Sequence, residues 1–66
     1  MKNIVRNLRK QRELTQEQLG EIIGVSRQTI NAIEKEKFDP SLPTAFKMSK
    51  LFEIAIEELF FYEGSK

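Results

Sequence analysis

The stretch "LTQEQLGEIIGVSRQTINAIEKEK", residues 14–37, decides the fold. A Thr-x-x-Gln capping-box pattern begins at Thr15 and predicts a helix that runs to about Ile23. Ser26 is a favoured N-cap for the next helix, which should end near Lys35. The link "IGVS" is too short for an antiparallel hairpin, so the two helices should cross at a steep angle.

Two glycines fit this crossing. Gly24 stands where the chain must turn sharply, and glycine adopts φ > 0 without steric cost. Gly20 costs roughly 1 kcal/mol against alanine inside a helix, but its missing Cβ allows a close approach of the next helix. We expect Leu19, Ile22 and Ile23 to face inward, and the apolar contact between the two helices to come from Leu19, Val25, Ile30 and Ile33. Together these features have the spacing of a helix-turn-helix unit.

The outer side of the second helix has an unusual composition. At about 100° per residue, Gln28, Asn31, Ala32 and Lys35 lie opposite the apolar Ile30. This side has no carboxylate and no large apolar group. It is therefore either an ordinary solvent-facing surface or a surface that recognises a ligand.

The rest of the chain predicts three more helices. Apolar residues among basic ones predict an amphipathic helix over residues 3–12. A second helix should begin at the Ser41 cap, with Pro43 in its first turn, and run to about Phe52. "EIAIEELFF", residues 53–61, predicts a short helix with three residues inward, and a tail follows: the inward residues are Ile56, Leu59 and Phe60. Strand-like alternation is absent from the sequence, so we expect an all-α fold of five short helices.

Length and composition narrow the function classes. The 66 residues suit one small domain, with the helix-turn-helix core at 15–36 and a C-terminal helix and tail at 55–66. The sequence has neither Cys nor His and no Gly-rich phosphate loop, so we expect no enzyme, no metal site and no cofactor. It also has no long apolar run, which favours a soluble cytoplasmic protein that does not bind a membrane.

Charge is distributed unevenly along the chain. Residues 1–12 hold five basic residues and no acidic one, whereas residues 51–66 hold four glutamates and one lysine. A basic end is one footprint of nucleic-acid binding, although terminal charge runs are more often just solvated.

The motif resembles the Cro and lambda-repressor type of helix-turn-helix, the XRE family of prokaryotic transcription regulators. The resemblance rests on Thr-Gln, Gly-Val-Ser, Arg-Gln-Thr-Ile and Ile-Glu in register, and it covers nearly the whole chain. It implies a five-helix lambda-repressor-like domain that binds double-stranded DNA. The first helix of the motif would cross the DNA backbone and the second would enter the major groove.

The resemblance also assigns roles to residues. It implies base contacts by Arg27, Gln28, Thr29, Asn31 and Ala32. It implies phosphate contacts by Gln16, Lys10, Arg12, Lys35 and Lys37, although for each cation a purely solvated role is about as common. A structural ion pair should join Arg9 to Glu34, because the family pairs arginine and glutamate at these positions.

Three positions depart from the family pattern. Glu36 stands where the family has a glycine, so either Glu36 adopts φ > 0 or its helix ends differently. Glu53 stands where glycine or asparagine is frequent, and Ala55 where a Ser or Thr cap is frequent. The last helix should therefore be weak.

Family members generally bind palindromic sites as two-fold dimers, and the C-terminal aromatic residues suggest where the dimer forms. The expected interface is Ile56, Phe60, Phe61 and Tyr62, unless Phe60 completes the core and only Phe61 and Tyr62 remain outside. The leading hypothesis is a sequence-specific regulator, most simply a repressor, that acts as a homodimer. The alternative is a protein-interaction module, such as an antitoxin or regulator subunit, that contacts a protein partner through this aromatic tail.

Overall fold

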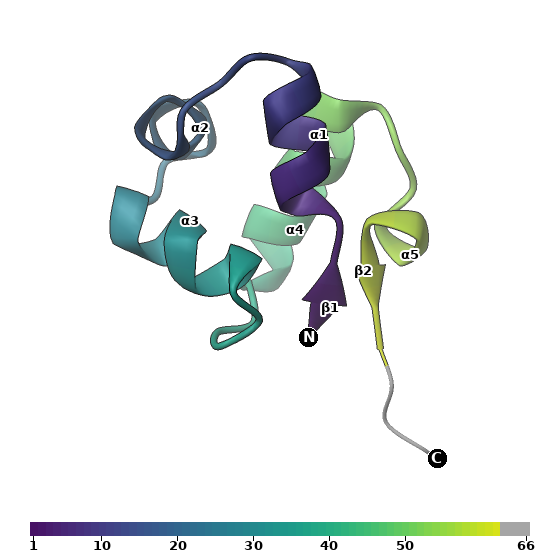
Figure 1. Ribbon diagram of the computed structural model, residues 1–66. Coiled ribbons are helices and arrows are strands. Elements are labelled where there is room, and N and C mark those ends of the chain that lie inside the picture. The colour runs from purple at the N-terminus through teal and green to yellow at the C-terminus, as the bar shows by residue number, and fades with distance from the viewer. Residues whose placement is uncertain (63–66) are drawn as a thin grey trace.

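The computed structural model describes residues 1–62, which form five α-helices and one pair of short strands. The elements are β1 (Lys2–Asn3), α1 (Val5–Gln11), α2 (Gln16–Ile23), α3 (Arg27–Glu34), α4 (Leu42–Phe52), α5 (Ile56–Leu59) and β2 (Phe60–Phe61). Helices α1 and α4 occupy the middle of the molecule, with α2 and α3 on one side and α5 with β2 on the other (Figure 1). None of these helices is long and apolar enough to cross a membrane, within the part of the chain described.

Every helix contributes a fully buried apolar side chain to one core. These side chains are Val5 from α1, Leu19 from α2, Ile30 and Ile33 from α3, Met48 from α4 and Leu59 from α5. The prediction that Ile22 faces inward is wrong, because 53% of this residue is exposed. Leu19 and Ile23 are four positions apart and share the core-facing stripe of α2, and Ile22 falls to the side of that stripe.

The starts predicted for three helices are confirmed, whereas the helix predicted over residues 3–12 begins only at Val5, because Asn3 belongs to β1. Thr15, Ser26 and Ser41 are the N-caps of α2, α3 and α4, and each side chain accepts a hydrogen bond from the backbone N–H three residues later. At Thr15 the full capping box forms, because the Gln18 side chain also accepts from the Thr15 backbone N–H at 2.8 Å. Such a cap is satisfied within one turn, which is why the local sequence is sufficient to locate it.

Three helices are each followed, within two residues, by a glutamate in the left-handed conformation. The φ angles are 58° at Glu13, 63° at Glu36 and 56° at Glu53. At each end the next residue donates its N–H to a carbonyl five positions back, as in a Schellman motif. Of the two alternatives left open at Glu36, the one with φ > 0 is confirmed, whereas nothing in the sequence indicates this conformation at Glu13. Each glutamate occupies a conformation that glycine adopts at lower cost.

The C-terminal helix predicted over residues 53–61 is too long. Helix α5 has only four residues, and its N-cap Ala55 makes no side-chain hydrogen bond, as the missing Ser or Thr predicted. Phe60 and Phe61 instead form β2, which pairs antiparallel with β1 in the register Lys2↔Phe61 and Asn3↔Phe60. The expectation of a chain without strands is therefore corrected. The pairing joins opposite ends of the sequence, so no local pattern predicts it.

Asn3 connects this strand pair to the end of α3. Its Nδ2 donates to the Ile33 carbonyl at 2.9 Å, and its Oδ1 accepts from the Val5 backbone N–H. The N-terminal ammonium of Met1 lies 3.0 Å from a carboxylate oxygen of Asp39, in the loop after α3. The start of the chain thus holds the C-terminal end of α3 in place.

Candidate nucleic-acid interface

The α2–α3 turn is held by one carbonyl. The Gly20 oxygen accepts from the backbone N–H groups of Gly24 at 2.7 Å and Val25 at 2.9 Å, and Gly24 has φ 94°. A Cβ at Gly20 would lie 2.6 Å from the Val25 carbonyl oxygen. Gly24 has the role that the sequence predicted, and the space left by the missing Cβ of Gly20 admits the backbone of the turn that leads into α3. This contact fixes the direction in which α3 leaves α2.

The first turn of α3 presents two free side chains. Arg27 and Gln28 are exposed, and no described residue forms a hydrogen bond with either side chain. Thr29 is half-buried, and its hydroxyl lies 3.0 Å from that of the cap residue Ser26. Ala32 is also half-buried. Of the predicted base contacts, Arg27 and Gln28 are thus the most accessible, while Thr29 already serves the helix cap.

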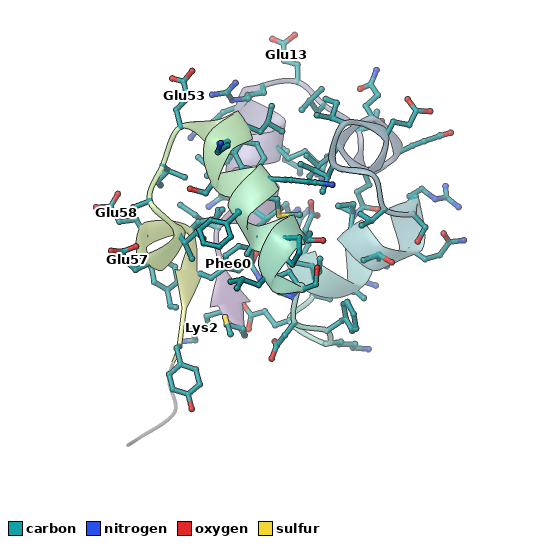
Figure 2. The ribbon with its side chains drawn as sticks, turned by 180° about the vertical axis from the view of Figure 1, so that it is seen from behind. Lys2, Glu13, Glu53, Glu57, Glu58 and Phe60 are labelled. Atoms are coloured by element: carbon teal, nitrogen blue, oxygen red, sulfur yellow. The ribbon has the colours of Figure 1, made fainter. Side chains whose placement is uncertain are left out.

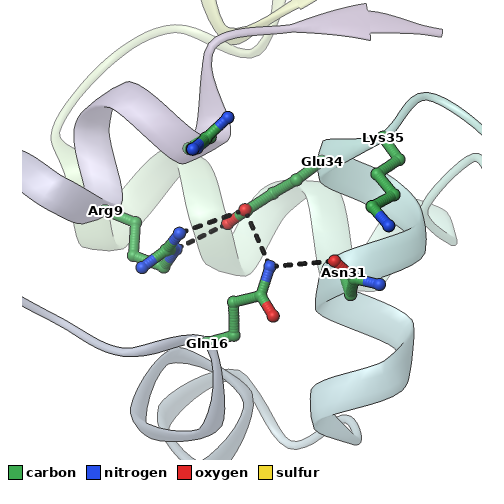
Figure 3. A pocket seen from close by; sticks show the side chains of 6 residues that line it. Arg9, Gln16, Asn31, Glu34 and Lys35 are labelled. Carbon is green, nitrogen blue, oxygen red and sulfur yellow. Dashed lines mark hydrogen bonds and ion pairs between the residues drawn. The ribbon is translucent and has the colours of Figure 1, made fainter.

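Asn31, the remaining predicted base contact, belongs to a hydrogen-bond network that joins α1, α2 and α3 (Figure 3). The Gln16 Nε2 donates to the Asn31 Oδ1 at 3.2 Å and to the Glu34 Oε1 at 3.0 Å. Arg9 donates to both oxygens of Glu34, through Nε at 2.6 Å and Nη2 at 3.2 Å, and its Nη1 donates to the Leu14 carbonyl. The predicted Arg9–Glu34 pair is therefore present.

The pair is buried and fully hydrogen-bonded. The Glu34 side chain is only 3% exposed, and Arg9 is one of the two buried polar residues of the described chain. No buried side-chain nitrogen or oxygen in residues 1–62 lacks a partner. A buried ion pair of this kind gains little net stability, but removing one partner leaves an uncompensated charge. Its main effect is to fix α3 against α1.

The network changes what the Gln16 side chain can do. Both Nε2 hydrogens are used within the protein, so only the Oε1 acceptor remains, and a phosphate accepts hydrogen bonds but does not donate them. A phosphate contact through this side chain would need the network to open. The backbone N–H groups of Gln16 and Glu17 have no intrahelical acceptor and remain available at the start of α2.

A polar hollow lies where the three helices meet. It is lined by Arg6, Arg9, Gln16, Asn31, Glu34 and Lys35. Arg6 is exposed and adds a cation that the sequence prediction omitted. Its position three residues before Arg9 on the same helix is the signal that would have indicated it.

The other cations predicted to contact phosphate are all exposed. The side chains of Lys10, Lys35 and Lys37 have no partner among residues 1–62, and the Arg12 guanidinium lies 5.8 Å from the centroid of the Phe52 ring. Lys10 and Arg12 lie at the C-terminal end of α1, whereas Lys35 and Lys37 follow α3. The cations therefore flank the α2–α3 unit at two ends.

The residues predicted for the dimer interface divide into two kinds. Phe60 is only 6% exposed and completes the core, as the alternative reading expected, and Ile56 is half-buried against the core. Phe61 is 39% exposed and Tyr62 80% exposed. The predicted tail residues 63–66 lie outside the described part of the chain.

Comparison with known proteins identifies the class. A helix-turn-helix family model matches residues 5–59, and the chain belongs to this family, of the XRE type that its motif indicated. The protein is a transcriptional regulator with a helix-turn-helix DNA-binding fold.

Individual relatives extend the likeness. The chain is 56% identical over 66 residues to the uncharacterized HTH-type transcriptional regulator MJ0272 of Methanocaldococcus jannaschii, covering 100% of both chains. It is 48% identical over 63 residues to the uncharacterized HTH-type transcriptional regulator YgzD of Bacillus subtilis, covering 96% of each. The P22 c2 repressor, solved in complex with a synthetic operator, has a similar structure with a TM-score of 0.77, 26% identity and 80% coverage of each chain. These matches confirm the five-helix repressor-like fold.

Proposed function

We propose that this protein is a cytoplasmic repressor that binds double-stranded DNA sequence-specifically as a homodimer on a palindromic operator. Helix α3 enters the major groove, and its first turn contacts base edges. Arg27 suits guanine or a phosphate, and Gln28 suits two-point pairing with adenine. Bound dimer occludes a promoter.

The observation that carries the proposal is the free start of α3. Arg27 and Gln28 are exposed and unengaged within the described residues, while the Gly20 contact and the Ser26 cap fix the helix that carries them. A contacting side chain on a rigid helix loses less conformational freedom on binding than one on a loop. The structurally similar P22 c2 repressor has been solved in complex with a synthetic operator.

Contacts to the DNA backbone come from the surroundings of α3. The unpaired N–H groups at the start of α2 favour an anion, as helix N-termini do, and Lys35 and Lys37 add positive charge after α3. The glutamates of the C-terminal part face elsewhere: Figure 2 shows Glu53, Glu57 and Glu58 on the α5 side, away from α2 and α3. Repulsion between these carboxylates and phosphate is therefore small.

The proposed dimer uses the apolar surface near the C-terminus. Phe61 and Tyr62 are exposed there, and Ile56 lines an apolar hollow together with Leu42 and Phe60. Apolar surface of this kind usually marks a contact. Two α3 helices in a two-fold dimer would contact half-sites about one DNA turn apart.

Selection of bound DNA from a random pool, followed by affinity measurement at several salt concentrations, tests the proposal. Arg27→Ala and Gln28→Ala should each lose about 1–3 kcal/mol on the selected operator and change the preferred base. Lys50→Ala is the control for lost charge, because it removes an exposed cation from the last turn of α4. If both α3 variants bind every sequence as Lys50→Ala does, α3 is not the recognition helix.

The oligomeric state is tested separately by light scattering during gel filtration. We expect a dimer of the wild-type chain and a monomer of Phe61→Ser/Tyr62→Ser, with weaker binding to a two-fold operator. A monomeric wild type that instead co-purifies with another protein covering Phe61 and Tyr62, and that binds no DNA, would favour the protein-interaction alternative.

A further inference from the structure

The hydrogen bonds around Glu34 all run toward its carboxylate. The carboxylate only accepts hydrogen bonds, and its Oε1 accepts from both Arg9 Nη2 and Gln16 Nε2. Gln16 must therefore turn its nitrogen, not its oxygen, toward Glu34. Because the Glu34 side chain is 3% exposed, the opposite orientation of Gln16 would place an amide oxygen against a buried negative charge.

This orientation determines that of Asn31. The second hydrogen of Gln16 Nε2 points to Asn31, which meets it with Oδ1 at 3.2 Å. If the Asn31 amide flipped, two NH₂ groups would face each other and one hydrogen bond would be lost. The Asn31 Nδ2 therefore lies on the side away from Gln16 (Figure 3), and no described residue accepts a hydrogen bond from it.

The surroundings of Asn31 favour an acceptor as its partner. Arg27, Asn31 and Lys35 are spaced four residues apart and so follow one face of α3. Asn31 also lines the polar hollow together with the cationic residues Arg6 and Lys35. Donors and positive charge thus meet at this point of the surface, and the Gln16 side chain supplies only a single acceptor.

We propose that Gln16 is a positioning residue that holds the Asn31 amide with its donors outward, so that Asn31 recognises a hydrogen-bond acceptor on DNA. The acceptor is an atom of a base edge, guanine O6 or N7 or thymine O4, or a phosphate oxygen. Adenine N7 is a further such acceptor, because Oδ1 keeps a second lone pair beside its bond to Gln16 and two-point pairing with adenine stays compatible with this orientation. The inference rests on the proposed DNA-binding function and deepens it.

Two variants isolate the effect. Asn31→Asp keeps an oxygen for Gln16 and removes both outward donors. Gln16→Ala keeps the donors of Asn31 but releases its amide to rotate. Gln18→Glu is the control for added charge on α2, because a glutamate at this position still accepts from the Thr15 N–H and preserves the capping box. Thermal unfolding establishes that each variant folds, and Asn31→Ser replaces Asn31→Asp if the latter does not.

The first measurement uses the free protein. In ¹H–¹⁵N spectra, Asn31→Ala should shift the side-chain amide signals of Gln16, because it removes one of the two acceptors of Nε2. Unchanged Gln16 signals would mean that the two side chains do not interact, and would overturn the inference while leaving the proposed function intact.

The second measurement uses DNA. We expect Asn31→Ala, which removes the donors without adding charge, to bind the selected operator about three- to tenfold more weakly than the wild-type chain, the range for one lost hydrogen bond. Asn31→Asp should lose more than Gln18→Glu does, because its carboxylate on α3 also repels phosphate. A loss confined to operators with one particular base at one position identifies a base acceptor, and Gln16→Ala, which frees the Asn31 amide to rotate, should then discriminate less between bases there. An equal loss on all sequences identifies a phosphate.

One result on DNA would overturn the inference: Asn31→Ala binding every sequence as tightly as the wild-type chain does. Failure of the wild-type chain to bind any DNA refutes the proposed function first, and the inference with it.

Discussion

Replacing Gly20 with alanine raises the helix propensity of α2 but places a methyl group too close to the turn that follows. Alanine is favoured over glycine by roughly 1 kcal/mol inside a helix, and Gly20 lies in the middle of α2. The added Cβ, however, would lie 2.6 Å from the Val25 carbonyl oxygen, which belongs to the backbone and not to a flexible side chain. The turn must therefore move away from α2.

The movement has two costs. Overpacking costs about 1–3 kcal/mol. It also stretches the hydrogen bonds from the Gly24 and Val25 N–H groups to the Gly20 oxygen, which contribute about 1 kcal/mol each. After the gain in propensity, we expect Gly20→Ala to lose about 2 kcal/mol of unfolding free energy, and its Tm to fall by roughly 8–16 °C.

Urea and thermal unfolding followed by circular dichroism measure this change at one fixed protein concentration. Glu21→Ala is the matched control, since it introduces alanine at the exposed neighbouring position of α2 and should stay within about 0.5 kcal/mol of wild type. A Gly20→Ala variant as stable as wild type, or more stable, would show that propensity outweighs the contact and would refute the argument.

Three further substitutions test other parts of the structure. Arg9→Ala leaves the buried Glu34 carboxylate unpaired and should cost about 3–5 kcal/mol in urea unfolding, and an unchanged midpoint would contradict the structural role of the pair. Glu36→Gly and Glu53→Gly relieve a left-handed φ and should each gain about 0.5–1 kcal/mol. Only Glu36→Gly should also tighten DNA binding, because it removes a negative charge next to α3. Equal DNA affinities of the two variants would contradict the placement of Glu36 near the bound DNA. Thr15→Ala removes the α2 capping box and should cost about 1 kcal/mol, whereas Thr15→Ser should remain near wild type; equal losses in both would exclude the cap as the cause.

Much of the fold was predictable because its signals are local. The caps at Thr15, Ser26 and Ser41 and the turn at Gly24 involve partners within one helical turn, and all four were placed correctly. The left-handed residue Glu36 was expected only because the family has a glycine there. The equivalent conformation at Glu13 had no such signal, since a glutamate gives no local indication of φ > 0.

Features formed by distant residues were predicted less well. The C-terminal helix was extended through Phe60 because apolar periodicity does not distinguish a last helical turn from a short strand. At Phe60 the chain instead leaves the helix and pairs with Asn3 of β1. Ile22 was placed inward because the sequence does not state how wide the covered stripe of α2 is.

The sequence by itself determined the helices, their order and the uncharged or cationic side of α3, because caps, glycines and 3.6-residue periodicity act between near neighbours. Tertiary structure decided which side chains on that surface are free. Arg27 and Gln28 remain available, whereas Gln16 is drawn into the buried Arg9–Glu34 pair. The acceptors of the Gln16 amide come from α3, and the Arg9 partner of Glu34 comes from α1, so these hydrogen bonds form only after three helices have packed together.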